Sequence, residues 1–240
     1  MTYTTFRRLL LCFVLLVTIT LHTSLLSAQI RVACIGNSIT YGYSIEDREH
    51  DSYPAQLQAM LGSSYQVMNY GVSGTTAQQE GDFPWTTTKE YQAAKAFLPQ
   101  ICVIKLGTND SKDRNWAGTE RFIQGLESLA KEFEQLESHP QIIIALPAKA
   151  YRENFHIRDS IIAQYELPAI RKMAKRHHWP LVELYKATGH MQQNFPDGIH
   201  PNPAGATVIA KKVKKAVKKC KVATESHFGI PWKTARCQRS

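Results

Sequence analysis

The sequence predicts an α/β fold built on a doubly wound parallel sheet, and the order of its elements supports this. Apolar runs rich in β-branched residues recur along the chain, as expected for strands buried on both faces: IRVACIG (30–36), YQVMNYG (65–71), ICVIKLG (101–107), QIIIALP (141–147) and PLVELY (180–185). Helix-like stretches alternate with them at 53–61, 88–97, 120–136, 159–177 and 203–219. Such alternation predicts right-handed crossovers, with helices on both faces of the sheet.

The chain length fits one globular domain preceded by an export segment. Residues 1–28 contain two arginines, then an apolar run, then the small residues Ser27 and Ala28 at a possible cleavage site. This is the pattern of a secretory signal peptide. The apolar run is shorter than the roughly 20 residues that a spanning helix needs, although Leu26 fits the cleavage site poorly and leaves an uncleaved anchor as the alternative. We expect a secreted or periplasmic domain at 29–219, a basic tail at 220–240 and no membrane insertion after cleavage.

The net charge of +9 is concentrated at the C-terminal end. Residues 211–240 hold eight lysines, two arginines and one acidic residue, whereas residues 29–210 carry a net charge of −2. In AKKVKKAVKKCK (210–221) small apolar residues recur on one helical stripe with lysines on the other faces. This pattern predicts a solvated last helix rather than a patch for nucleic acid or membrane, so we expect no nucleic-acid partner.

The cysteines indicate no metal site. Cys34 and Cys102 lie in strand-like runs and are predicted to be buried thiols. Cys220 and Cys237 flank the tail and could pair in an oxidising compartment. The chain has no C-x-x-C or H-E-x-x-H spacing, so no metal ligand set is predicted.

Polar, mostly glycine-rich segments follow four of the predicted strands. They are GNSITYG after the first strand, GVSGTT after the second, GTND after the third and DGIH after the fifth. The carboxyl ends of parallel strands meet at one edge of the sheet, where α/β folds bind their ligands. Convergence of four such turns therefore predicts a functional site at this edge.

Ser38, in GNS, is the candidate nucleophile of that site, although it could instead merely cap the turn that follows. A serine hydroxyl is a weak nucleophile until a base takes its proton, and histidine is the usual base. His200 can act as that base, and Asp197, three residues before it, can orient the imidazole. Alone, D-x-x-H would be read as a polar turn, so the assignment depends on the shared edge.

Acyl transfer also needs hydrogen-bond donors for the oxyanion that forms on the substrate. Gly74, in GVSGTT, can present a backbone N–H, and Asn109, in GTND, can add a side-chain amide. The N–H of Ser38 can be a third donor. Both segments also fit ordinary turns, since S-G and N-D are common turn pairs.

In this order, GNS, glycine, GTND and DxxH resemble the SGNH hydrolase family, also called GDSL esterases and lipases, over about residues 30–219. The resemblance implies a three-layer flavodoxin-like fold with strand order 2-1-3-4-5 and no cofactor. It implies these roles: Ser38 as nucleophile, Asp197 and His200 completing the triad, and Ser38, Gly74 and Asn109 forming the oxyanion hole. Asn37 departs from the family's name motif, which has aspartate there, but a short polar residue can still make the hydrogen bonds of the turn.

The sequence around these motifs, including VIKLGTNDSK and FPDGIHPNPAG, is similar to that of the secreted carbohydrate esterases of this family. The resemblance implies a serine esterase that removes short acyl groups, acetyl above all, from carbohydrate hydroxyls through an acyl-enzyme. Trp85 and Trp116 are candidates to stack on a sugar ring, and Lys112 could meet an acidic sugar. The alternatives are that the aromatic residues pin their loops and that the lysine is solvated.

Other functions stay open at this point. A lysophospholipase or thioesterase would use the same chemistry, but the sequence shows no long apolar insertion that would form a lid or groove. A carbohydrate-binding relative with a relict site is disfavoured because every catalytic position is filled. Turnover of a simple acetyl ester separates that class from an enzyme.

Overall fold

The computed structural model describes residues 29–222. The predicted signal peptide at 1–28 and the predicted pairing of Cys220 with Cys237 involve segments that lie outside the described residues, as does most of the basic tail. The domain limits at 29 and 219 therefore stay predictions.

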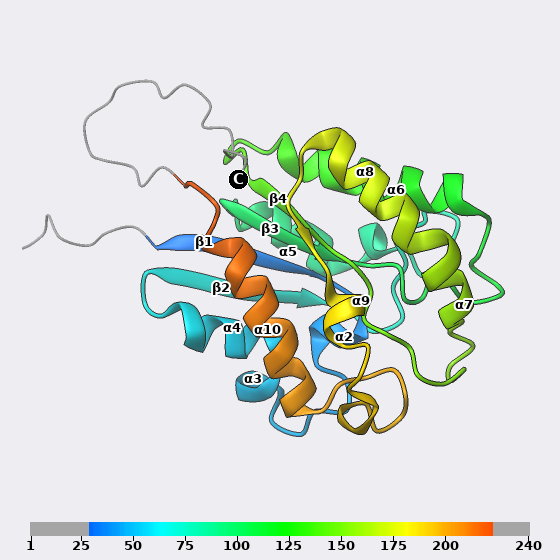
Figure 1. The fold of residues 1–240 in the computed structure, drawn as a ribbon. Coiled ribbons are helices and arrows are strands. Elements are labelled where there is room, and N and C mark those ends of the chain that lie inside the picture. The colour runs from blue at the N-terminus through cyan, green and yellow to red at the C-terminus, as the bar shows by residue number, and fades with distance from the viewer. Residues whose placement is uncertain (1–28, 223–240) are drawn as a thin grey trace, which may run out of the picture.

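A parallel sheet of five strands forms the centre of the domain (Figure 1). Its order is β2-β1-β3-β4-β5, and all four pairings are parallel, which confirms the predicted α/β class and strand order. The strands are β1 (Ile30–Gly36), β2 (Tyr65–Gly71), β3 (Ile101–Lys105), β4 (Gln141–Ala145) and β5 (Leu181–Val182). The last strand is shorter than predicted because the chain turns at Glu183 into a short helix.

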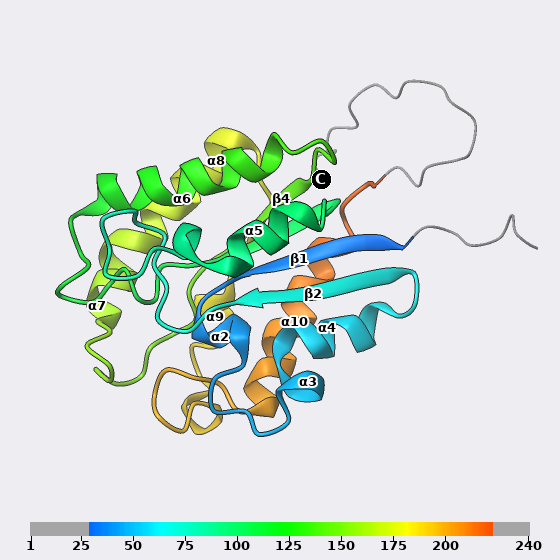
Figure 2. The same cartoon turned by 180° about the vertical axis from the view of Figure 1, so that it is seen from behind.

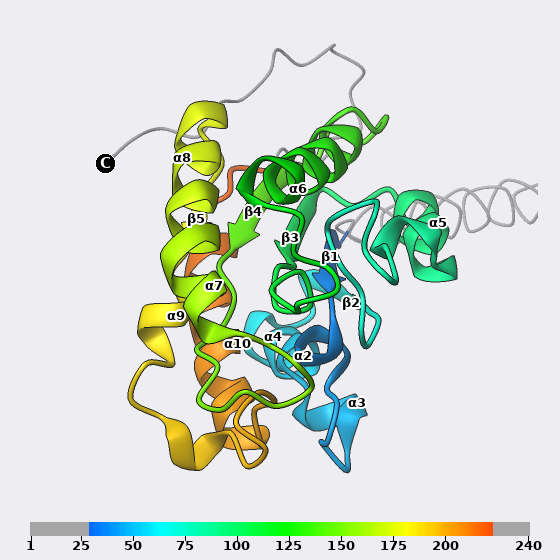
Figure 3. The same cartoon turned by 90° about the vertical axis from the view of Figure 1, so that its right-hand side faces the viewer.

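Helices cover both faces of the sheet, as Figure 2 and Figure 3 show. One face carries α4 (Tyr53–Leu61) and α10 (Pro203–Val217), with the short α2 (Ser38–Tyr41), α3 (Arg48–Asp51) and α9 (Leu184–Ala187) beside them. The other face carries α5 (Lys89–Ala96), α6 (Thr119–Glu134) and α8 (Leu167–His177). The remaining elements are α7 (Asp159–Ile161), the π-helical turn Ile162–Glu166 between α7 and α8, and the 3-10 turns η2 (Trp85–Thr87) and η4 (Gln192–Asn194).

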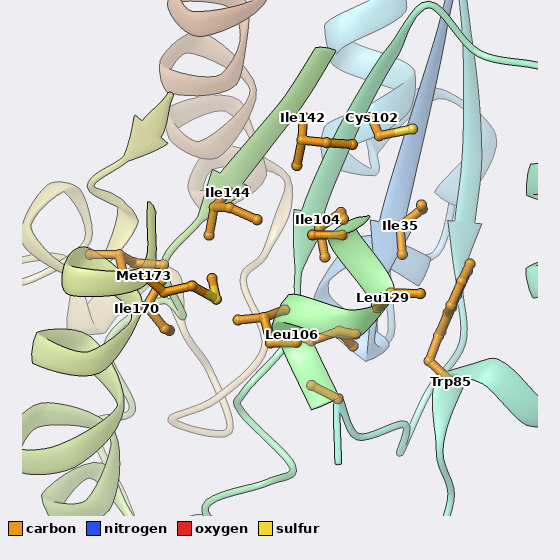
Figure 4. Packing of buried hydrophobic residues seen from close by; sticks show 14 of the residues in the cluster. Ile35, Trp85, Cys102, Ile104, Leu106, Leu129, Ile142, Ile144, Ile170 and Met173 are labelled. Carbon is orange, nitrogen blue, oxygen red and sulfur yellow. The ribbon is translucent and has the colours of Figure 1, made fainter. Parts of the chain in front are cut away.

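Alternate residues of the buried strands supply two separate cores, because successive strand side chains point to opposite faces. In β1, Ile35 packs with α6 and α8, whereas Cys34 packs with α4 and α10. Figure 4 shows the first core, where Ile35, Ile104 and Ile144 of the sheet meet the helix residues. The predicted burial of the thiols of Cys34 and Cys102 is confirmed.

The last helix has the predicted division into an apolar stripe and lysines. Val213 and Val217 are fully buried, and Lys211, Lys212 and Lys215 are exposed. In the described part of the chain, no helix combines the length and apolarity needed to cross a membrane.

Candidate active site

The turn after β1 holds Ser38 in a tightly packed position at the start of α2. Asn37 caps this helix, its Oδ1 accepting a hydrogen bond from the N–H of Ile39 at 3.2 Å. Gly71, at the end of the neighbouring β2, lies against the backbone of α2, so that a Cβ there would stand 2.1 Å from the nitrogen of Tyr41. The glycine allows this close approach, which places Ser38 at the carboxyl edge of the sheet.

His200 connects Ser38 to Asp197. The His200 Nε2 lies 2.8 Å from the Oγ of Ser38, and its Nδ1 lies 2.6 Å from the Oδ2 of Asp197. The other carboxylate oxygen, Oδ1, accepts the backbone N–H groups of Ile199 and His200 at 2.8 and 2.7 Å. The structure thus brings together the three side chains predicted from sequence, and a proton on Nδ1 leaves Nε2 free to accept the serine proton.

The surroundings favour a neutral imidazole and an ionised carboxylate. Burial lowers the pKa of His200 below its usual value; the charges of Lys105 and Lys112 lower it further, and Asp197 opposes them. Burial raises the pKa of Asp197, but the hydrogen bonds from His200 and Ile199 outweigh it and hold that pKa below its usual range. His200 is therefore suited to act as a base at neutral and mildly acidic pH.

The pH dependence of hydrolysis should show this shift. Because imidazole accepts the serine proton only when neutral, kcat/KM should rise as pH increases through the His200 pKa and then level off. Since that pKa lies below 6.5, half-maximal activity is expected below pH 6.5. The measurement is a kcat/KM profile on p-nitrophenyl acetate, corrected for the stability of the protein at each pH.

A charge variant sharpens this test. Lys112→Met removes a positive charge that disfavours the imidazolium. The acid limb of its pH profile, where kcat/KM rises with pH, should therefore move to higher pH. Lys89→Met, which changes an exposed lysine at the start of α5, serves as the control and should leave the limb in place. A limb that stays fixed in Lys112→Met, or moves to lower pH, contradicts this electrostatic assignment.

The two loops with the predicted oxyanion donors are tied together. Gly74 adopts φ +88°, a left-handed conformation that favours glycine. The Asn109 side chain is buried, and its Nδ2 donates to the Thr75 carbonyl at 3.0 Å. No group within residues 29–222 accepts a hydrogen bond from the amides of Ser38 or Gly74, so both donors are available to a substrate. The oxyanion role of these groups stays a prediction.

Asp110, which follows Asn109, is a positioning residue that the sequence reasoning missed. Its buried carboxylate accepts the backbone N–H groups of Ala77, Gln78 and Gly107 at 2.9 to 3.1 Å. These bonds join the loop after β2 to the loop after β3. Burial raises the Asp110 pKa to about 6, although the backbone hydrogen bonds oppose this. The sequence could have indicated this role, because in GTND the acidic residue Asp110 directly follows the candidate oxyanion donor Asn109.

Buried ionisable side chains lie beneath the nucleophile turn. Lys105, at the end of β3, is fully buried, and its Nζ donates to the Asn37 Oδ1 at 3.3 Å. Burial lowers the Lys105 pKa to about 7, whereas Glu166 of the π-helical turn opposes this. Gly107 leaves space for Glu166, because a Cβ there would lie 2.8 Å from its Oε2. In the sequence, a lysine inside the apolar run ICVIKLG could have indicated this buried charge.

The prediction that Trp85 stacks on a sugar is wrong. Its side chain is 1% exposed and lies in the hydrophobic core (Figure 4). Its Nε1 donates to the Tyr70 carbonyl at 3.0 Å, and its ring packs against Tyr91 and Phe133. The physical reason is that the η2 turn directs this ring under α5 and α6, where burial of a large aromatic surface stabilises the fold. Trp85 thus pins its loop to the core.

The other two predicted substrate residues lie partly or wholly inside the protein. Trp116 is half-buried, with its ring against Phe122 and Tyr165. Lys112 is 7% exposed, and burial lowers its pKa; it is therefore not the solvated lysine of the alternative interpretation. Contact of either residue with substrate stays a prediction.

Among residues 29–222, no three His, Cys, Asp or Glu side chains gather in a way that could hold a metal ion.

The chain is similar to known proteins in sequence and in fold. The GDSL-like lipase/acylhydrolase family matches residues 34–208. An acetylxylan esterase from Xylanibacter ruminicola is 37% identical over 207 residues, which cover 79% of this chain and 43% of that protein. The chain therefore spans less than half the length of this relative.

Solved structures share the fold at low sequence identity. A carbohydrate acetylesterase from Sinorhizobium meliloti has a TM-score of 0.65 and 16% identity, over 79% of this chain and 99% of that chain. An aryl esterase from M. smegmatis has a TM-score of 0.66 and 17% identity, over 80% and 99%.

Proposed function

The chain belongs to the GDSL-like lipase/acylhydrolase family, and from this premise we propose that it hydrolyses acetyl esters on carbohydrate hydroxyl groups through an acyl-enzyme. The observation that carries the proposal is the chain of hydrogen bonds from Asp197 through His200 to Ser38. The 37% identity to an acetylxylan esterase supports the choice of acetyl group and carbohydrate.

The geometry supports a two-step acyl transfer. The Oγ of Ser38 attacks the ester carbonyl carbon while the Nε2 of His200 takes its proton. We assign the stabilisation of the oxyanion that forms to the amides of Ser38 and Gly74 and to the Nδ2 of Asn109. Collapse of this intermediate breaks the bond to the sugar oxygen, which receives the proton from His200, and leaves acetyl on Ser38.

Water then completes the reaction. His200 takes a proton from a water molecule, whose oxygen attacks the acetyl carbonyl carbon. The bond to the Oγ of Ser38 breaks, the serine regains its proton from His200, and acetate leaves. Every proton in this cycle is carried by His200, and no step calls for a cofactor.

The length of the acyl chain distinguishes the proposed activity from that of a lipase. A long chain must bury its methylenes, each worth about 0.8 kcal/mol, against apolar walls. The segments near the site, NDSKDRNWAG and AYRENFHIRDS, are mostly polar. We therefore expect kcat/KM on p-nitrophenyl esters to fall from acetate to octanoate, and acetate to be released from acetylated xylan. A rise towards octanoate would point to the lipase-like alternative.

We also propose that the enzyme acts outside the cytoplasm, as a secreted or periplasmic protein. The support is the N-terminal pattern of residues 1–28, two arginines followed by an apolar run and small residues. N-terminal sequencing of the exported protein tests this: the first residue should lie close to Gln29, and a first residue well before Ala28 would contradict cleavage there.

A further inference from the structure

Two exposed aromatic rings lie directly against the histidine of the candidate active site. Tyr43 and Phe155 are 42% and 43% exposed, and their ring centroids lie 4.5 and 5.4 Å from that of His200. They also meet each other edge to face, at 6.3 Å and 84°. Unlike Trp85, these rings keep much of their surface open to a ligand.

Hydrogen bonds tie the backbone at both aromatic residues to segments that carry triad residues. The Tyr43 N–H donates to the carbonyl of Ser38 at 2.9 Å. On the other side, the Asn154 Oδ1 accepts the N–H of Phe155 at 2.9 Å, and its Nδ2 donates to the Asp197 carbonyl at 3.1 Å. The backbone that carries each ring is therefore linked to a segment of the triad, to Ser38 for Tyr43 and to Asp197 for Phe155.

The backbone around Phe155 is strained. Phe155 and His156 have φ values of +55° and +61°, a left-handed conformation that bulky side chains rarely adopt. Residues in such strained conformations are often found at active sites and ligand clamps. Here the strain accompanies a ring that is displayed at the surface, beside the reacting atoms.

The direction of proton transfer tells which part of the substrate these rings face. The Nε2 of His200 must give its proton to the oxygen of the leaving alcohol, so that alcohol lies on the histidine side of the site. The carbonyl oxygen of the ester is directed towards Gly74 and Asn109, the predicted oxyanion donors. Tyr43 and Phe155 contact His200, and they consequently face the alcohol, which is the sugar in the proposed reaction.

A polar depression of about 340 Å³ adjoins Phe155. It is lined by Phe155 together with Asp113, Glu153, Asn154, His156 and Arg158. These side chains offer donors and acceptors that suit hydroxyl groups. The Arg158 guanidinium is 2.9 Å from the Asp113 carboxylate, so its charge is already matched and the lining favours a neutral ligand over an acidic one.

We propose that Tyr43 and Phe155 form an aromatic platform that binds the ring of a neutral acetylated sugar, and that the depression beside Phe155 receives the hydroxyls of the adjoining sugar unit. This inference rests on the proposed function, because it assigns the alcohol side of that reaction. The apolar faces of a pyranose ring stack on aromatic rings, while its hydroxyls need polar partners at the edge.

The test compares two acetyl esters that differ only in their alcohol. Acetate release is measured from an acetylated xylo-oligosaccharide and from ethyl acetate, whose alcohol has no ring to stack. With both substrates measured on the pH plateau, Tyr43→Ala and Phe155→Ala should each lower kcat/KM about tenfold more on the oligosaccharide than on ethyl acetate, and the extra loss should fall mainly on KM. Tyr43→Phe keeps the ring and should retain the activity, whereas Phe155→Leu keeps apolar bulk without a ring and should not.

Tyr165→Ala is the matched control, since Tyr165 is 47% exposed and contacts Trp116 rather than His200. It should leave both substrates unchanged. Equal losses on both substrates in Tyr43→Ala and Phe155→Ala would make these rings structural and overturn the platform. Unchanged oligosaccharide activity in both variants would overturn it too.

The platform and the proposed function can fail separately. A wild-type enzyme that cleaves ethyl acetate but no acetylated oligosaccharide would contradict the proposed function. Calorimetric binding of the oligosaccharide to Ser38→Ala protein supplies a readout without turnover. Combining Ser38→Ala with Phe155→Ala should weaken that binding about tenfold; binding of unchanged strength would contradict the platform whatever the kinetics show.

Discussion

Ser38→Ala and His200→Ala are each expected to lower kcat on p-nitrophenyl acetate by about 10⁴-fold or more, and the double variant to lose little beyond either single one. The reason is that the 2.8 Å contact between Oγ and Nε2 makes one functional unit. Without the hydroxyl there is no nucleophile to activate, and without the imidazole the hydroxyl keeps its proton. The measurement is kcat for wild type, both single variants and the double variant.

The chain offers a matched control for the histidine. Asp47 and His50 have the same D-x-x-H spacing, and their Nδ1 to Oδ1 distance is 2.9 Å, but both side chains are exposed. His50→Ala should leave kcat unchanged within about twofold, because exposed pairs contribute little. Additive losses in the double variant, with melting temperatures held near that of wild type, would contradict the triad.

Asn109→Ala is expected to lower kcat by about 10²–10³-fold while KM changes little. Its amide is predicted to donate to the oxyanion, which carries full charge only in the transition state, so the loss should fall on kcat. Asn109→Asp keeps the shape of the side chain but has no N–H to donate, and it should lose at least as much. Steady-state kinetics on p-nitrophenyl acetate measure both parameters.

The bond from the Asn109 Nδ2 to the Thr75 carbonyl requires a check on structure. If Asn109 only held the loops together, Asn109→Ala would lower the melting temperature, and the loss of activity would follow the unfolded fraction. A kcat loss of less than about tenfold in a protein of wild-type melting temperature would remove Asn109 from the oxyanion hole.

The sequence alone determined the fold class and the edge where the chemistry lies. Strand and helix patterns are local, because they depend on side-chain periodicity within a few turns. The strand β1 and the helix α4 have the predicted bounds. Parallel strands bring their carboxyl ends to one edge, so the order of the elements along the chain suffices to assign the turns with Ser38, Asn109 and His200 to that edge.

Which polar and aromatic side chains face that edge was decided only by the tertiary structure. The two D-x-x-H patterns look alike in sequence, but only His200 is brought to Ser38, across 162 residues. Trp85, chosen from sequence, is buried in the core, whereas Tyr43 and Phe155 lie against the catalytic histidine. The physical reason is that burial depends on contacts between segments far apart in the chain, and no local pattern of residues encodes which loop covers which.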